Sequence, residues 1–317
     1  MPERNNLDNK EPKAKSTMGR AKIEEMEEKS EEINNLERLP EGCISDILSL
    51  TTPADVCRSN LLSSLIKSAA DSDVIWEKFL PADYQDIISR SFYPFPSAAA
   101  PSKKELYYRL CNAPLLIDGG FKSFQLEKSG GKKCIMIGAK ELDIAWGDDP
   151  NHWYWRFYPG SRFAEVAELK WSCWLEIRGK LETQLLSPKR FYAAYLVLKF
   201  KQDVYGFDDE PIKAKVEVVG RAGGNNGEER CIYLSPNGGK GQYVARKRGD
   251  GWMEVELGHF YNEELEDDEE VHISVLETES LGAKYGIIVQ GMELRPKADT
   301  HQYCKTTVIH GKALYCK

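Results

Sequence analysis

The feature that most constrains this chain is a change in the period of its hydrophobic pattern near Cys111. From there on, apolar and polar residues alternate in short runs, and clusters of glycine, proline and asparagine separate the runs. A period of two is typical of strands that bury one face. The predicted strands lie in KCIMIGAKELDIAW, ELKWSCWLEIRGKLE, FYAAYLVLKF, KAKVEVV, GWMEVELGHF, VHISVLET and YGIIVQGMELRP. Because no helices alternate with them, we expect an antiparallel β-sandwich, jelly-roll-like in form.

Between residues 36 and 82 the pattern is helical. Ile44, Ile47 and Leu48 form an i, i+3, i+4 stripe behind Pro40, which suits the first turn of a helix. Two further helices are predicted, one after a capping box at TTPAD and one at VIWEKFL, so the module has three helices. A module of this size buries little surface, and a partner that covers its apolar stripe would stabilise it. The fold class is therefore α+β, with a small helical module before the sandwich.

Composition divides the rest of the chain. Residues 1–35 are charged, lack aromatic residues and show no apolar stripe, so we expect a disordered tail, with a loosely helical tail as the alternative. Residues 83–110 are predicted to be a linker with a short helix that starts near Ser102. The sandwich is expected to span residues 111–297, and a second tail of residues 298–317 follows it.

Charge and cysteine content narrow the possible partners and location. A formal net charge of −7 disfavours a broad phosphate-binding surface, so we expect no nucleic-acid partner. The apolar runs fall short of the ~18 residues that a membrane helix needs, and the N-terminal segment lacks the apolar core of a secretory signal. Eight cysteines without a C-x-x-C pair indicate reduced thiols in a cytosolic or nuclear protein. We expect no metal and no cofactor, since the tail residues His301, Cys304, His310 and Cys316 fit no structural zinc spacing.

Five of the seven tryptophans lie between residues 146 and 174. Trp146 and Trp153 flank the turn GDDPN, Trp155 shares a strand face with Trp153, and Trp174 falls in the polar phase of its strand. Proteins hold a sugar ring with an aromatic face beneath its C–H groups and with acids or amides at its hydroxyl edge. From residue types alone, a sugar-binding surface and a packed corner of the sandwich both stay open.

Sequence motifs of enzymes are missing. The chain has no G-x-S-x-G, no H-E-x-x-H and no phosphate-binding G-x-x-x-x-G-K-[ST], and its five histidines are dispersed. We therefore expect a protein that is not an enzyme. A glycosidase with two carboxylates across a cleft is the alternative, because acidic residues are abundant.

The stretches LPEGCISDIL and AADSDVIWEKFLP resemble the F-box over residues 36–82. This resemblance implies docking onto the Skp-type adaptor of a cullin-based ubiquitin ligase. By the resemblance, the adaptor-binding residues are Leu39, Pro40, Ile44, Ile47 and Leu48, with Trp76 in support. The alternative is that these residues only form the core of a small helical domain.

Residues 112–296 resemble the phloem protein 2 family and its tobacco-lectin-like members. The matching stretches are LDIAWGDDPNHWYW, AEVAEL, CWLEIRGKLET, YAAYLVLKF, DGWMEVELGHF and YGIIVQGMELRP. The resemblance implies binding of N-acetylglucosamine oligomers or N-glycans, with Trp146 and Trp153 as stacking rings and Glu270 and Glu277 as acidic contacts. Glu270 lies in the acidic run EELEDDEE, where a solvated charge run is the alternative.

An F-box followed by a phloem-protein-like lectin domain is the arrangement of a plant F-box family, the phloem protein 2-B type. It implies the substrate receptor of an SCF-type ubiquitin ligase, a non-catalytic subunit that binds target glycoproteins. The alternative is an interaction protein whose sandwich has lost sugar binding and binds polypeptide. The tobacco-lectin-like members carry a lysine run for nuclear import, whereas this chain has only ARKR at 245–248, so we expect a cytoplasmic protein, with the nucleus as the alternative.

Overall fold

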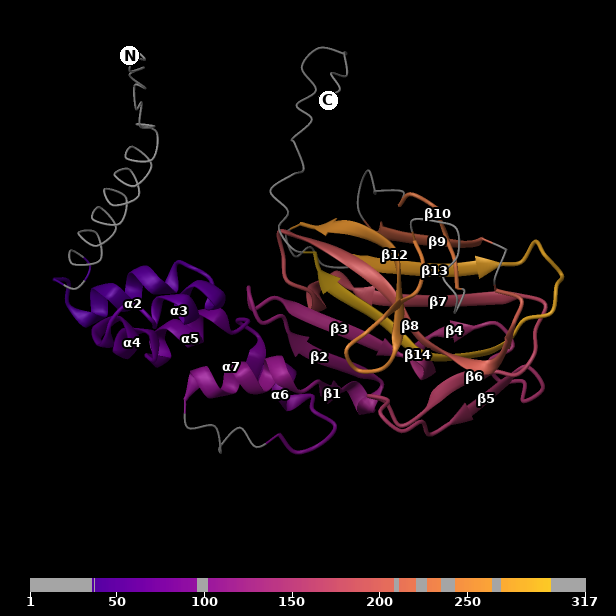
Figure 1. The fold of residues 1–317 in the computed structure, drawn as a ribbon, viewed down its shortest axis with the longest axis horizontal. Helices are drawn as coiled ribbons and strands as arrows, with labels where there is room; N and C mark the ends of the chain where they lie inside the picture. Colours follow the sequence, from indigo (N-terminus) through magenta and orange to yellow (C-terminus); the bar gives the residue numbers. More distant parts are fainter. Residues whose placement is uncertain are drawn as a thin grey trace, which may run out of the picture. The chain divides into compact units, whose positions relative to one another are not determined.

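The structure, a computed structural model, describes residues 36, 38–95, 102–207, 211–220, 227–234, 243–263 and 269–297. The two predicted tails, residues 1–35 and 298–317, lie outside these ranges, and His301, Cys304, His310 and Cys316 lie outside them with the second tail. The chain divides into two compact units between Phe79 and Leu80, and each is described here by itself (Figure 1). None of the helices in the described ranges is long and apolar enough to cross a membrane.

The described part of the first unit contains four short helices, where three were predicted. They are α2 (Glu41–Ser49), α3 (Pro53–Ser59), α4 (Ser64–Ala70) and α5 (Asp73–Phe79). The predicted cap of α3 is confirmed, because the Thr52 hydroxyl accepts a hydrogen bond of 3.2 Å from the Asp55 amide. The prediction of a single helix after this cap is wrong. Ser63 starts a new helix by accepting a hydrogen bond of 3.2 Å from the Ile66 amide.

One side of each helix builds the core of the first unit. Its buried apolar residues are Ile44, Leu48, Val56, Ile66, Ala69, Ala70, Ile75 and Trp76. The indole N–H of Trp76 donates a hydrogen bond of 2.7 Å to the carbonyl oxygen of Ala70, at the end of α4. The ring therefore fills the core and fixes the turn between α4 and α5 at the same time.

The second unit starts with two helices, α6 (Tyr84–Ser89) and α7 (Lys103–Asn112), where one was predicted. Ser102 caps α7 by accepting a hydrogen bond of 3.1 Å from the Glu105 amide. Both helices pack on the sandwich, α6 on strand β1 and α7 on strand β2. The segment predicted as a linker thus contributes two packed elements to the second unit.

Two antiparallel sheets make up the rest of the second unit, as far as the structure describes it. The larger sheet has the order β1 (Leu115–Ile117), β2 (Lys122–Leu126), β3 (Lys133–Gly138), β14 (Tyr285–Pro296), β8 (Arg190–Tyr205), β12 (Met253–Asn262), β11 (Arg246–Lys247), and β6 (Val166–Leu169) joins it at β14 and carries β5 (Trp153–Arg156). The smaller sheet has the order β10 (Arg230–Ile232), β9 (Ile212–Val219), β13 (Glu270–Glu277), β7 (Leu175–Glu182), β4 (Asp143–Ile144). Three single-turn 3₁₀ helices, η2 (Asp118–Gly120), η3 (Ala139–Glu141) and η4 (Thr183–Leu185), join strands. The predicted order of helices followed by an antiparallel sandwich is confirmed.

Alternation along the strands builds the core between the sheets. In β13, for example, Val271, Ile273 and Val275 are buried while the residues between them are partly exposed. β9, β13 and β7 run side by side across the upper part of the second unit, and β5 and β6 lie together at its lower edge (Figure 1). β5 contains Trp153 and Trp155, and Trp171 follows β6 by two residues.

Strand β14 departs from simple alternation because most of its residues are buried on both faces. The loop between β5 and β6 covers its outer face. The indole N–H of Trp252 donates a hydrogen bond of 3.1 Å to Gly160 of this loop, and Arg162 of the loop forms an ion pair of 2.7 Å with Glu293 of β14. A loop thus supplies the second cover that the sandwich needs on this side.

Glu293 is a buried carboxylate that is surrounded by cations. Arg248 and Arg295 approach it at 2.6 and 3.3 Å, in addition to Arg162. Burial alone would raise the pKa of Glu293, but the three guanidinium groups outweigh burial and hold the pKa below its ordinary value of 4.5. The carboxylate therefore contributes stability above about that pH, and the contribution is lost as the pH falls.

We expect Glu293→Gln to lower the free energy of unfolding of the second unit at pH 7 by about 3–5 kcal/mol, because it removes the buried negative charge that Arg162, Arg248 and Arg295 share. The difference in the free energy of unfolding between the variant and the wild type should narrow as the pH falls below 4.5. In that range the wild-type carboxylate takes up a proton and becomes neutral, as the glutamine is at every pH. Urea unfolding followed by tryptophan fluorescence over this pH range measures both effects. Glu279→Gln, at an exposed ion pair with Lys213, is the matched control and should change little. If the difference in the free energy of unfolding stayed constant with pH, the stabilising role given to the ionised Glu293 carboxylate would be contradicted.

Candidate functional site

The turn after β4 holds Trp146 in an unusual backbone conformation. Its φ is +62°, in the left-handed region that bulky residues rarely adopt. Two indole groups clamp the chain on either side, since Trp153 donates a hydrogen bond of 3.0 Å to Ala145 and Trp155 one of 2.8 Å to Gly147. Such a conformation costs on the order of 1–3 kcal/mol and points to a functional constraint. Its effect is to leave the Trp146 ring 51% exposed.

The structure separates Trp146 from Trp153, which were predicted to form one platform. Trp153 is only 2% exposed, so neither face of its ring is free to contact a ligand. Its predicted place in an exposed platform is therefore wrong, and its role in the turn is structural. Trp155 is half-buried, with the ammonium group of Lys140 lying 3.9 Å from its ring centre.

Other aromatic residues accompany Trp146 instead. Its ring stacks on His152 with centroids 5.5 Å apart and an interplanar angle of 30°, and lies 6.5 Å from the ring of Trp174. His152 in turn lies 6.0 Å from the ring of Trp171. Trp171 and Trp174 are both exposed. We call these four side chains, Trp146, His152, Trp171 and Trp174, the aromatic platform.

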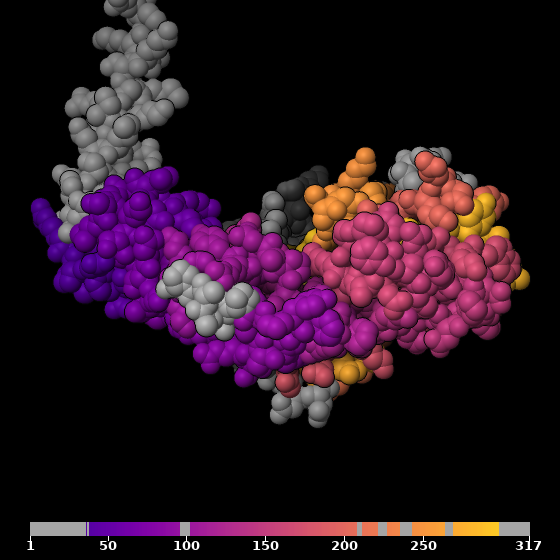
Figure 2. Space-filling view, turned by 90° about the horizontal axis from the view of Figure 1, so that it is seen from below, coloured from indigo at the N-terminus to yellow at the C-terminus, as the bar shows by residue number. Residues whose placement is uncertain are grey.

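Three of the four platform residues, Trp146, Trp171 and Trp174, are exposed. Figure 2 shows that rose-coloured stretches, the colour of residues near 150 in its bar, form much of the visible surface of the second unit. Trp171 and Trp174 belong to the connection between β6 and β7. Trp174 falls among the polar positions of the alternating sequence pattern, and this position predicted its exposure. Trp171 lies outside a regular strand, so alternation does not decide which way its ring points.

A buried ion pair supports the segment with Trp171 and Trp174. The Glu277 carboxylate pairs with the ammonium group of Lys284, and the side chains of both are at least 95% buried. Lys284 also donates a hydrogen bond of 3.3 Å to the Cys173 carbonyl, and its backbone exchanges hydrogen bonds of 2.7 and 2.9 Å with Ser172. Glu277 was predicted to contact sugar, but its carboxylate does not reach the surface. Its role is to position the connection.

Glu270, the second predicted acidic contact, lies at the other end of β13. In the pairing with β7, Glu277 lies opposite Leu175, beside the platform, whereas Glu270 lies opposite Glu182. Seven residues of strand place the two backbone positions roughly 23 Å apart. The Glu270 carboxylate lies 2.9 Å from Nε2 of His272. The structure therefore does not bring Glu270 to the platform.

The polar groups beside the platform come from the turn itself. Oδ2 of Asp149 lies 3.9 Å from Nε2 of His152, and its Oδ1 accepts a hydrogen bond of 2.8 Å from the Asn151 amide. Lys170 donates a hydrogen bond of 2.7 Å to the Pro150 carbonyl. Sequence reasoning missed Asp149 and Lys170 as candidate ligand contacts, although the GDDPN turn that carries Asp149 was visible. An acid and a cation next to exposed rings can bind the hydroxyl edge of a ligand while the rings bind its flat face.

The first unit exposes only part of the predicted adaptor-binding set. Leu39, Pro40 and Ile47 are exposed. Ile44 and Leu48 are buried in the core, so the prediction that they contact a partner is wrong for the unit as folded. Trp76 is fully buried, where it can support the surface but not touch a partner.

Further exposed leucines were missed. Leu50 is 85% exposed and Leu61 is 89% exposed, and Leu62 and Val74 are also exposed. Leu50 lies three residues after Ile47, so both side chains emerge from one side of α2 and the turn that ends it. Scattered apolar side chains are normal on a surface, and these are available for contact with a partner.

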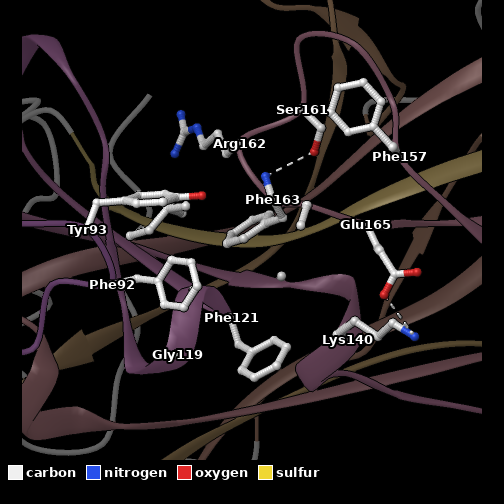
Figure 3. Close-up of a pocket in the computed structure, with 14 residues that line it drawn as sticks. Phe92, Tyr93, Gly119, Phe121, Lys140, Phe157, Ser161, Arg162, Phe163 and Glu165 are labelled. Atoms are coloured by element: carbon white, nitrogen blue, oxygen red, sulfur yellow. Dashed lines mark hydrogen bonds and ion pairs between the residues drawn. The ribbon is translucent and has the colours of Figure 1, made fainter.

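A separate hollow of about 300 Å³ lies elsewhere on the second unit (Figure 3). Four exposed aromatic residues line it: Phe92, Tyr93, Phe121 and Phe157. Its charged side chains already have partners, Lys140 with Glu165 at 3.4 Å and Arg162 with Glu293. The hollow contains none of the predicted site residues and offers mainly apolar contacts.

Comparison with known proteins assigns the second unit to a family. Residues 132–296 match the family model of phloem protein 2. The Arabidopsis thaliana F-box protein PP2-B10 is 45% identical over 269 residues, which cover 84% of this chain and 95% of that protein. F-box protein At2g02240 and F-box protein SKIP3, from the same plant, are 44% and 40% identical and cover 81% and 83% of this chain, and 79% and 89% of their own lengths. The solved structure of TmCBM61 with β-1,4-galactotriose is 11% identical, covers 49% of this chain and 87% of its own, and has a TM-score of 0.26, a level that supports no inference.

The two tryptophans of the turn should respond differently to truncation. We expect Trp153→Ala to lower the free energy of unfolding by about 3–5 kcal/mol, because it empties a core position and frees the Ala145 carbonyl. Trp146→Ala should cost less than about 1 kcal/mol, because the ring is exposed. Urea unfolding of the full chain, followed by near-ultraviolet circular dichroism, compares the two variants. A large loss for Trp146→Ala with none for Trp153→Ala would contradict the assignment.

Proposed function

This chain belongs to the F-box proteins of the phloem protein 2-B type, and we propose that it is the substrate receptor of an SCF-type cullin ubiquitin ligase. In this proposal, the first unit docks onto the Skp-type adaptor, and through it onto the cullin. The second unit binds the target. The chain is then a non-catalytic subunit, and the ubiquitin-transfer chemistry belongs to other members of the complex.

The exposed apolar side chains of the first unit support the docking role. Burial of apolar surface contributes roughly 25 cal/mol per Å², so Ile47, Leu50 and Leu61 offer a partner a substantial gain. Interface energy is usually concentrated in a few such side chains. The buried residues Ile44 and Trp76 hold the helices that present them.

We expect the double change Ile47→Ala and Leu50→Ala to weaken binding of the full chain to a Skp-type adaptor at least tenfold, through loss of buried apolar surface. Surface plasmon resonance with the purified adaptor measures the affinity. Leu281→Ala, an equally exposed leucine of the second unit, is the control and should leave binding unchanged. Wild-type affinity in the double variant would contradict the docking surface.

For the second unit, we propose that the aromatic platform binds glycans that contain N-acetylglucosamine, on target glycoproteins. The observation that carries this proposal is the Trp146 ring, which a strained backbone holds out in solvent. Trp171 and Trp174 extend the exposed aromatic surface, and Asp149 lies beside it. The resemblance to sugar-binding members of the phloem protein 2 family supports the same choice of ligand.

One observation favours a second candidate, a protein-interaction adaptor without sugar binding. Three of the four residues carried over from the sugar-binding relatives, Trp153, Glu270 and Glu277, do not share an exposed site with Trp146. In that case the exposed rings would contact a polypeptide. The two candidates differ in whether a free oligosaccharide binds.

We expect Trp146→Ala and Trp174→Ala each to weaken binding of N-acetylglucosamine oligomers by a few tens-fold, as loss of a stacked ring costs ~2 kcal/mol or more. Isothermal titration calorimetry on the full chain measures this. Phe191→Ala, which removes an exposed ring that packs at a tilted angle against Tyr261 elsewhere on the larger sheet, is the matched control. Absence of oligosaccharide binding by the wild-type chain, with retention of a protein target, would support the second candidate instead.

A further inference from the structure

We propose that the aromatic platform continues into a second saccharide subsite around Tyr154, on the outer face of the larger sheet. This proposal rests on the glycan-binding function proposed above and adds a prediction about ligand length. One linear oligosaccharide would contact the platform with one end and the hollow at Tyr154 with the other. The argument starts from strand register.

The register of β5 and β6 places the platform and Tyr154 on one continuous face. Tyr154 pairs with Glu168, and the Lys170 amide donates a hydrogen bond of 2.9 Å to the His152 carbonyl. This hydrogen bond continues the pairing of β5 and β6 by one residue on each strand, so the alternation of side chains extends to His152 and Lys170. His152 and Tyr154 therefore share a face, as do Glu168 and Lys170. Trp153 lies between His152 and Tyr154 and points inward, as its burial shows. His152 of the platform is thus the outward neighbour of Tyr154.

A hollow of about 420 Å³ lies where this face meets β14 and β8. Its lining residues are Tyr154, Glu168, Leu169, Lys170, Lys201, Asp203, Tyr285 and Gly286. Lys170 lines the hollow and directly precedes Trp171 of the platform, so the hollow and the platform are next to each other along the chain. A register shift between Tyr285 and Ile287 interrupts the ladder with β8, and Gly286 adds no side chain to the hollow.

The chemistry of the hollow suits the two sides of a sugar residue. Tyr154 is 54% exposed, and Tyr285 stacks on Tyr205 with centroids 5.5 Å apart, so aromatic faces lie at the rim. Between them, charged groups can bind hydroxyls. Lys201 lies 2.8 Å from the carboxylate of Glu168 and 3.7 Å from that of Asp203.

Glu168 gives the hollow a fixed polar floor. Its carboxylate is largely buried, and its second oxygen accepts a hydrogen bond of 2.9 Å from Arg156. Two cations therefore hold the carboxylate in one orientation without placing a full negative charge at the surface. The aromatic-lined hollow of Figure 3 has no such polar floor, and none of its lining residues is next to a platform residue in the sequence, whereas Lys170 of the hollow at Tyr154 directly precedes Trp171. These contrasts select the hollow at Tyr154 as the subsite.

Two subsites joined end to end make affinity depend on ligand length. Isothermal titration calorimetry of the full chain with N-acetylglucosamine oligomers, from the disaccharide to the hexasaccharide, tests this. We expect wild-type affinity to rise with length. Tyr154→Ala should leave the affinity for the disaccharide unchanged and lower that for the hexasaccharide about tenfold, so that the rise is lost. Tyr154→Phe keeps the ring and should therefore retain most of the increase in affinity with oligomer length.

The other outcomes separate this inference from the function on which it rests. An unchanged length dependence in Tyr154→Ala, or an equal loss at every length, overturns the second subsite but leaves the platform in place. A wild-type affinity that does not rise with length overturns it as well. Failure of the wild-type chain to bind any oligomer overturns the proposed glycan-binding function itself. Tyr261→Ala, an exposed tyrosine elsewhere on the larger sheet, is the matched control and should behave as the wild type.

Discussion

A buried indole N–H needs an acceptor, and much of this structure is organised around that requirement. Four of the seven tryptophans donate to a backbone carbonyl, and each of them fixes a loop or turn. Trp76 holds the turn before α5, and Trp252 holds the loop that covers β14. Trp153 and Trp155 hold the turn that presents Trp146. The remaining three tryptophans are exposed, and all of them belong to the platform.

Buried charge has a similar positioning role. A buried ion pair contributes little net stability compared with apolar packing, but removing one partner is costly, so the pair fixes which segments meet. Glu277 and Lys284 attach the connection that carries Trp171 and Trp174 to the end of β13. Glu293 attaches the loop between β5 and β6 to β14 through Arg162. Glu277, which was predicted to contact a ligand, therefore has a structural role below the surface.

The sequence predicted the fold where local rules decide the outcome. The period of two identified the sandwich, and the cap at Thr52 identified the start of α3. The break at Ser63 was missed, because the apolar side continues through it. For the site, the cluster of tryptophans and the exposure of Trp174 could be predicted, whereas the burial of Glu277 could not. That burial depends on the ion pair with Lys284, which the turn after β13 brings back to Glu277. Hydrophobic periodicity does not predict the path of such a turn.

The left-handed backbone at Trp146 also makes this position informative across relatives. Glycine adopts such a conformation without penalty, so a glycine here would stabilise the turn and remove the ring in one step. If stability alone decided, substitution of this tryptophan by glycine would therefore be favoured. Only a function of the ring, such as ligand binding, would keep the tryptophan in place. In a family in which many sandwiches share one architecture, the residue at this turn would then distinguish chains that still use the surface from chains that keep only the scaffold.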